Sequence, residues 1–287
     1  MSLLHADIRL SVCLLGASLA HGQVLLLDEF NGSALDTTLW RLPDPGAGSF
    51  LGRTQLRLQD APQVTGGVAR LRLDTWNGGG SFLGSEIITT QTFELGTGLA
   101  FETTSRLVDP PPGLVGSLFS YVFFSGVRDE IDVELLSNQV HSGQHDLLTN
   151  VFDNDGFDTG GDGAFVDPAG LDLTRFNTYR VEWRSDRIDW FVNGVLVRSE
   201  THTVPDAATT IRLNFWAPGE DFSAAYSEQL QPAAFSWQNQ TYYYEVDRVL
   251  IERLSVPEPA MAALLLTVAP LLMRRRGGAD GCADFRG

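Results

Sequence analysis

Short runs of alternating apolar and polar residues recur along most of this chain of 287 residues. The segments Val68–Asp74, Arg180–Arg184 and Ile188–Val192 alternate with period two, which predicts half-buried β-strands. Clusters of Gly, Asn, Asp and Pro separate such runs, and Asn193-Gly194 is typical of a tight hairpin turn. Because no long stretch has the period of a helix, the pattern predicts one all-β sandwich domain over residues 23–254.

Residues 130–135 form the most informative predicted strand, because acidic and aliphatic side chains alternate along it. The acids are Glu130, Asp132 and Glu134, and the period of a strand places all three on one face. Unpaired buried charge is costly, so this face either lies in solvent or lines a polar cleft. Like charges repel along a strand and strands disfavour Asp, so an ordinary solvated face has little reason to contain this triplet. Paired carboxylates are what retaining glycoside hydrolysis requires.

The two ends of the chain differ from the predicted domain. Residues 10–20 are apolar, follow a segment with one Arg and precede small residues, which predicts a secretory signal peptide over residues 1–22. The run is too short to span a membrane, and the alternative is a buried N-terminal helix.

Residues 255–287 contain Pro257-Glu258-Pro259, then an apolar run to Met273 and three arginines. This segment resembles the PEP-CTERM sorting signal of exopolysaccharide-producing Gram-negative bacteria. A helix over the run would span roughly 21 Å, short of a bilayer core of roughly 30 Å. The resemblance implies transient membrane association and localisation at the cell surface; the alternative is a C-terminal core helix.

Composition narrows the possible partners. A formal net charge of −16 argues against nucleic acid and anionic membrane surfaces, and it is compatible with a neutral polysaccharide. Cys13 and Cys282 both fall outside residues 23–254, so the predicted domain has no disulfide. A sandwich of that length buries enough core to fold without one, and we expect a monomer.

The acidic strand, Glu130-Ile-Asp-Val-Glu134, resembles the active-site strand of glycoside hydrolase family 16, which includes lichenases, laminarinases and xyloglucan-modifying enzymes. The single residue between Asp132 and Glu134 is similar to the lichenase and xyloglucan subgroup. Further segments similar to the family occur in family order between residues 26 and 252: residues 28–36, 84–96, 113–121, 176–183, 188–194, 213–218 and 244–249. The resemblance implies a jelly roll of two antiparallel sheets whose concave face forms a glycan cleft.

The resemblance also implies a role for individual residues. Glu130 is expected to be the nucleophile, Glu134 the general acid and base, and Asp132 a neighbour that tunes their protonation. Positions expected to bind the substrate are Glu86, Tyr121, Asn150, Asn214 and Trp216. For these polar groups the alternative is a locally satisfied side chain, and for Trp216 it is core packing. We expect Trp183 and Trp190 in the core, with a ligand platform as the alternative.

No cofactor is expected except a structural calcium ion, for which Asp247 is the candidate ligand. The chain departs from the family at three positions. Ile88 replaces a common Arg, Arg128 stands where lichenases often carry Trp, and Asn177 replaces a common His. These departures leave the catalytic groups in place and bear on which glucan is recognised.

The sequence therefore predicts a secreted, endo-acting β-glycanase that acts with a retaining mechanism on a β-glucan-type polysaccharide. Two alternatives remain. A transglycosylase would use the same site with a sugar hydroxyl in place of water. A non-catalytic glycan-binding protein of the extracellular matrix would not need the two glutamates.

Overall fold

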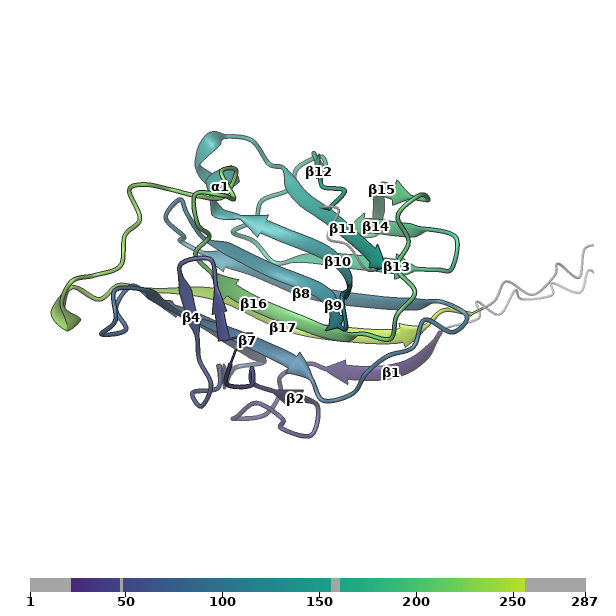
Figure 1. The fold of residues 1–287 in the computed structure, drawn as a ribbon, viewed down its shortest axis with the longest axis horizontal. Coiled ribbons are helices and arrows are strands. Elements are labelled where there is room, and N and C mark those ends of the chain that lie inside the picture. Colours follow the sequence, from purple (N-terminus) through teal and green to yellow (C-terminus); the bar gives the residue numbers. More distant parts are fainter. Residues whose placement is uncertain (1–21, 47–48, 156–160, 256–287) are drawn as a thin grey trace, which may run out of the picture.

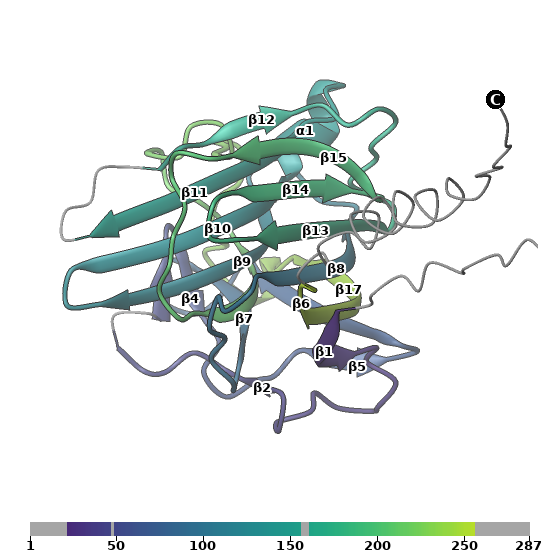
Figure 2. The ribbon, with the colours of Figure 1, turned by 90° about the vertical axis from the view of Figure 1, so that its right-hand side faces the viewer.

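In the computed structural model, which describes residues 22–46, 49–155 and 161–255, strands form two stacked and mostly antiparallel sheets. Two views of the molecule show these sheets as stacked layers (Figure 1 and Figure 2). Stacked antiparallel sheets are typical of β-sandwiches. The predicted all-β fold is confirmed.

The first sheet consists of β1 (Gln23–Asp28), β5 (Gln63–Thr65), β6 (Val68–Asp74), β8 (Leu99–Val108), β13 (Asn177–Trp183), β14 (Ile188–Val192), β15 (Val195–Glu200) and β17 (Thr241–Arg253). Its strand order is β15–β14–β13–β8–β17–β6–β5. The second half of β17 pairs with β8 on one side and with β1 on the other. Gln23 therefore lies opposite Arg253. The two ends of the predicted domain therefore meet on one edge of this sheet.

The second sheet consists of β2 (Trp40–Arg41), β7 (Phe82–Thr89), β9 (Val115–Phe124), β10 (Val127–Leu136), β11 (Leu147–Asp155), β12 (Ala164–Val166) and β16 (Thr210–Trp216). Its order is β2–β7–β16–β9–β10–β11–β12. A short β4 (Thr54–Leu56) runs parallel to the start of β7, and β3 (Phe50–Leu51) pairs with β4. The acidic strand β10 lies inside this sheet, between β9 and β11.

Two short helical elements complete the described secondary structure. Helix α1 (Ser137–Ser142) follows β10, and the 3-10 turn η2 (Ser236–Gln238) precedes β17. In the described part of the chain, no helix has the length and apolar character needed to cross a membrane.

The strand pattern read from the sequence matches the structure closely. Strands β6 and β14 have the predicted bounds, and Asn193 and Gly194 form the turn between β14 and β15 with φ angles of 51° and 79°. Tight two-residue hairpin turns favour residues that can adopt such positive φ angles. Period-two alternation is informative for β6, in which buried and partly exposed residues alternate, whereas β14 also buries Asp189 on its polar face.

The core lies between the two sheets, and its largest members are aromatic. Trp183 and Trp190 are each only 1% exposed, so their predicted place in the core is confirmed. The indole N–H of Trp190 donates to the backbone carbonyl of Asp132 at 3.0 Å, which links the first sheet to the acidic strand. Replacing a core Trp with Ala typically lowers the free energy of unfolding by about 3–5 kcal/mol. Because the indole of Trp190 is packed this firmly, its hydrogen bond gives β10 a rigid support.

Candidate active site

A cavity of about 690 Å³ lies over the outer face of the second sheet. Strands β7, β16, β9, β10 and β11 contribute side chains to it, and all eight residues predicted to act on or bind the substrate line it. They are Glu86, Tyr121, Glu130, Asp132, Glu134, Asn150, Asn214 and Trp216.

The acidic strand divides its side chains between the cavity and the core, as its alternation predicts. The aliphatic side chains of Ile131, Val133 and Leu135 are at most 1% exposed and belong to the core cluster. The carboxyl groups of Glu130, Asp132 and Glu134 line the cavity on the other face.

Strand register determines which side chains lie beside each acid. Glu130 is flanked by Tyr121 on β9 and Phe152 on β11. Asp132 is flanked in the same way by Phe119 and Asn150. Two residues further along, Glu134 lies beside Ser117 on β9 and Leu148 on β11. The three acids thus have different neighbours, although they share one strand face.

Arg128 makes the environment of Glu130 distinct from that of the other two acids. Its Nε and Nη2 atoms lie 2.9 Å and 2.7 Å from the same carboxylate oxygen, Oε2 of Glu130. The guanidinium also stacks over the ring of Phe152, with its central carbon 3.7 Å from the ring centroid. A charge-assisted contact of this kind favours the ionised form of the carboxylate.

Burial and charge separate the protonation of the three acids. Burial raises the pKa of Glu130, but Arg128 acts against that rise. Burial raises the pKa of Asp132 well above its usual range, and the charges of Glu130 and Glu134 add to the effect. The pKa of Glu134 rises to about 8, first through burial and then through the charge of Glu130. Burial therefore favours the protonated form of Glu134, whereas Arg128 favours the ionised form of Glu130.

A second cation, Arg212 on β16, lines the same cavity as the three acids of β10. Its Nη1 atom is 3.3 Å from Oε1 of Glu86, and its guanidinium stacks over Tyr121 at 4.6 Å from the ring centroid. Burial raises the pKa of Glu86, whereas the charge of Arg212 lowers it. The ion pair between Arg212 and Glu86 holds the cavity wall in place next to β7.

Trp216 lies between the cavity and a small apolar cluster. Its indole lines the cavity, yet it is only 9% exposed and packs in a cluster with Val115, Leu136 and Leu148. Gly52 allows this packing, because a Cβ atom there would lie 2.9 Å from the indole and its φ is +54°. Only part of the ring can therefore meet a sugar, and the rest stabilises the cavity wall.

Gly161 lies close to the side chain of Asn150. A Cβ atom on Gly161 would lie 2.5 Å from Oδ1 of Asn150, so a larger residue there would push this side chain aside. The same Oδ1 accepts a hydrogen bond from the backbone N–H of Val151 at 3.0 Å. These two contacts restrict the orientation of Asn150 at the cavity; its predicted role in substrate binding stays a prediction.

Sequence reasoning did not select Arg128, Arg212 or Phe152 as site residues, although all three line the cavity. Arg128 was noted only as a departure from the family. A signal was present, since Arg128 and Glu130 are two residues apart on one strand and must share a face. Of the other two departures, Ile88 is buried, and Asn177 donates to the carbonyl groups of Asp172 and Arg175.

The calcium prediction concerns a different region. Asp247 is exposed at a bulge of β17, between Val246 and Arg248. In the described part of the chain, no group of three or more His, Cys, Asp and Glu side chains could hold a metal ion. Calcium takes six to eight oxygen ligands, so backbone carbonyls and water would have to supply most of them beside Asp247. The ion stays a prediction.

Two known proteins are similar in sequence to part of this chain. A β-glucanase of Brevibacillus brevis is 36% identical over 112 residues, which cover 37% of this chain and 40% of that protein. Crh-like protein 5 of Aspergillus fumigatus is 30% identical over 118 residues, 39% of this chain and 28% of that protein. The chain thus matches about two fifths or less of the length of these relatives.

Solved structures show the same fold. A β-1,3-1,4-glucanase (lichenase) from a mouse hindgut metagenome superposes with a TM-score of 0.64 at 19% identity, covering 80% of this chain and 99% of the lichenase. The laminarinase catalytic domain of Thermotoga petrophila gives 0.64 at 17% identity, with 82% and 99% covered. The predicted jelly roll is confirmed. The sequence profile of "Glycosyl hydrolases family 16" matches residues 55–234, and the chain belongs to this family.

Proposed function

We propose that the protein is an endo-acting β-glycanase that hydrolyses a β-glucan-type polysaccharide by a retaining, double-displacement mechanism. The observation that carries this proposal is the contrast between two glutamates on one strand face. Glu130 is paired with a guanidinium, whereas burial raises the pKa of Glu134 to about 8. A carboxylate held by a cation and a carboxyl group kept protonated by burial are what a nucleophile and a general acid need. The names of the β-glucanase and lichenase relatives support the substrate class.

In the first step, an oxygen of Glu130 attacks the anomeric carbon, and the bond from that carbon to the glycosidic oxygen breaks. Glu134 gives its proton to the departing oxygen, so the leaving sugar departs as a neutral alcohol. In the second step, Glu134 takes a proton from water, and the water oxygen bonds to the anomeric carbon. The ester bond to Glu130 breaks and its electron pair returns to the carboxylate. Two inversions at one carbon give net retention.

Arg128 assists this cycle as a positioning residue. Both of its contacts with Glu130 reach Oε2, so Oε1 is the oxygen that we assign to the attack. The guanidinium can keep its place on Oε2 while the ester forms and breaks. It stabilises the carboxylate charge that returns in the second step, which makes Glu130 a better leaving group.

The stereochemistry of the first product tests the proposal directly. Incubation with lichenan, laminarin, xyloglucan or agarose should yield oligosaccharides from at least one substrate, and proton NMR should show that the first-formed anomer is β. An initial α anomer would mean that water attacks directly, and the role of Glu130 would then be wrong. Addition of an acceptor sugar separates hydrolysis from transglycosylation, because only a transglycosylase turns most of the product into acceptor adducts.

We propose further that the protein is secreted and sorted to the cell surface. The predicted signal peptide (residues 1–22) and sorting segment (residues 255–287) lie outside the described residues, apart from Gly22 and Ser255. Among the described residues the paired strands run from Gln23 to Arg253, which supports a folded domain between the two segments.

Deleting residues 256–287 in the native host should release active enzyme into the medium, as cell fractionation and a zymogram would show. A truncated protein that misfolds would show instead that the apolar run belongs to the core, and the sorting proposal would fail.

A further inference from the structure

Two aromatic side chains stand exposed on the loop between β16 and β17, outside the set of residues that line the cavity. Trp237 is 78% exposed and Phe235 is 57% exposed. Their rings stack with an interplanar angle of 6° and a centroid distance of 5.9 Å. Burial of large apolar groups drives folding, so an exposed aromatic pair in an ordered turn indicates a binding surface.

The turn that carries this pair is closed by its own backbone. The N–H of Gln238 donates to the carbonyl of Phe235 at 3.0 Å, and the N–H of Asn239 donates to that of Ser236 at 3.2 Å. These bonds form the 3-10 turn η2 and fix the two rings on one side of it.

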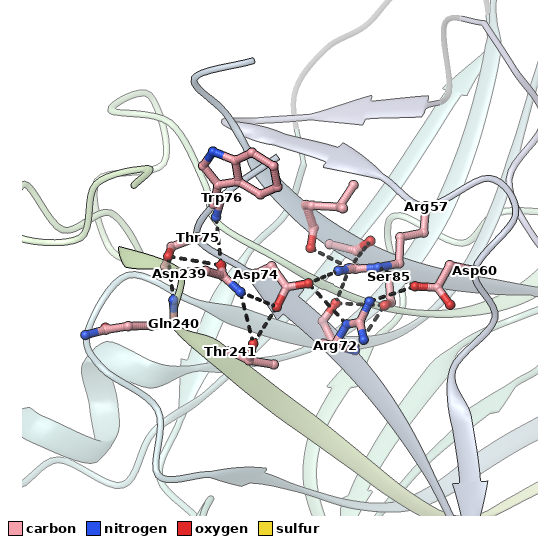
Figure 3. A network of polar contacts seen from close by, with 12 residues as sticks. Arg57, Asp60, Arg72, Asp74, Thr75, Trp76, Ser85, Asn239, Gln240 and Thr241 are labelled. Atoms are coloured by element: carbon pink, nitrogen blue, oxygen red, sulfur yellow. Dashed lines mark hydrogen bonds and ion pairs between the residues drawn. The ribbon is translucent and has the colours of Figure 1, made fainter. Parts of the chain in front are cut away.

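The loop is also fastened to the turn between β6 and β7 (Figure 3). The side-chain carbonyl of Asn239 accepts from the N–H of Trp76 at 2.9 Å, and its amide donates to Asp74 at 3.2 Å. Backbone bonds join Thr75 to Gln240 at 2.9 Å and to Ala233 at 2.8 Å. Asn239 therefore connects the aromatic turn to the backbone of Trp76, a residue that is 37% exposed.

This network continues into a buried ion pair. Asp74 contacts the guanidinium of Arg57, whose side chain is only 3% exposed, and it lies 3.2 Å from Nε of Arg72. A loop anchored to buried charge keeps its shape before any ligand arrives. Such preorganisation lowers the entropy that is lost on binding.

The chemistry of the loop indicates the ligand. No charged residue occurs from Gln229 to Tyr244, in a chain whose net charge is −16. The groups beside the rings are amides and hydroxyls, among them Gln238 and Gln240. Neutral amides can hydrogen-bond sugar hydroxyls, and an aromatic face packs against the C–H face of a pyranose. A membrane-surface segment typically carries Lys or Arg, which this loop lacks.

We propose that Trp237 and Phe235 form a second, non-catalytic site for a neutral β-glucan-type polysaccharide. This inference rests on the proposed function for its choice of ligand. A chain held at both sites dissociates more slowly than one held at the cavity alone, because the second contact is intramolecular. The aromatic turn would therefore retain the enzyme on long polymers and contribute nothing to the cleavage of short ones.

The test compares Trp237→Ala with Phe176→Ala, a control at an aromatic residue that is 38% exposed, next to β13, and does not line the cavity. Both are made in the full chain and in a Glu130→Ala background, so that binding is measured without hydrolysis. Affinity electrophoresis in a gel with soluble lichenan should show binding weakened about fivefold by Trp237→Ala and unchanged by Phe176→Ala. With Glu130 present, Trp237→Ala should leave kcat/KM on a tetrasaccharide unchanged.

The outcomes are distinguishable from those of the proposed function. If a polymer that the enzyme cleaves retards Trp237→Ala and its parent protein equally in the gel, the proposed second site is wrong. The proposed hydrolysis is not affected by that result. A polymer that is bound through Trp237 but never cleaved would support the second site and contradict the proposed hydrolysis. Loss of binding to phosphatidylcholine vesicles, with retention on polysaccharide unchanged, would identify a membrane contact instead and overturn the proposal. Trp237→Tyr should restore retention, since it keeps an aromatic face.

Discussion

Glu130→Ala should lower kcat/KM on the preferred β-glucan by about 10⁴-fold or more, because the variant has no group to form the glycosyl-enzyme. Its fold should remain intact. Glu130 lies in the cavity next to two other acids, so its removal relieves repulsion with Asp132 and Glu134. The guanidinium of Arg128 loses a partner, but it keeps its stacking contact with Phe152 and its side chain is 29% exposed. Initial rates and a thermal melt measure both parts of this expectation.

Added azide separates loss of the nucleophile from general damage. In Glu130→Ala the missing side chain leaves room for azide, which can attack an activated aryl β-glycoside and give the α-glycosyl azide. Glu130→Gln is the matched control, since its amide fills the same space and should not be rescued. A Glu130→Ala variant that retains more than a few per cent of activity without azide would show that another group is the nucleophile.

How far the sequence predicts this site depends on the physical origin of each feature. Alternation along residues 130–135 determines which side chains share a face, and the structure confirms that division between the cavity and the core. Alternation contains nothing about the neighbouring strands. Arg212 and Phe152 were therefore missed, because only the register of β16 and β11 brings them to the cavity.

The protonation of Glu134 also depends on features of the fold that strand alternation does not contain. The family resemblance implied that Asp132 tunes the protonation of Glu134, whereas the causes that raise the pKa of Glu134 in the structure do not include Asp132. The larger cause is burial in the cavity, and the charge of Glu130 comes second. A one-dimensional pattern contains the charges of a strand but not the depth of the cleft that desolvates them.

Trp216 is a case in which the alternatives were not exclusive. The family resemblance implies sugar stacking, and the alternative is core packing. At 9% exposure the ring packs in a small apolar cluster and also lines the cavity, because the cavity wall is the edge of that cluster. Sugar stacking by this residue stays a prediction.

The second large effect concerns Glu134 and the pH dependence of kcat/KM. With Glu130 ionised and Glu134 protonated in the active form, the profile should be bell-shaped, with an alkaline limb near the pKa of about 8. Glu134→Gln should lose about 10²–10⁴-fold on polysaccharide and lose the alkaline limb. On an aryl glycoside whose leaving group needs no proton, its first step should persist, and azide should yield the β-glycosyl azide.

Arg128→Gln is the partner variant that should move the opposite limb. Arg128 lowers the pKa of Glu130, so its removal raises that pKa and shifts the acid limb to higher pH. The other groups that face Glu130 remain, namely Asp132 and Glu134 on β10, Tyr121 on β9, Arg212 on β16 and Glu86 on β7. Because Arg212 still offers positive charge, the shift should be partial. An acid limb that stays in place would show that Arg128 does not control the ionisation of Glu130.

Glu134 should also leave a signature in folding that is independent of catalysis. Its folded-state pKa of about 8 exceeds its ordinary value of 4.5, so the folded protein holds a proton that the unfolded chain releases between these values. The free energy of unfolding should therefore fall as pH rises through that window, by up to about 1.4 kcal/mol per pH unit. Glu134→Gln cannot titrate, so urea melts should show a shallower fall and a relative gain in stability at pH 8 that disappears below pH 4.5. If both proteins lose stability in parallel from pH 5 to 8, Glu134 is already ionised in the free enzyme, and it cannot be the acid that protonates the leaving oxygen.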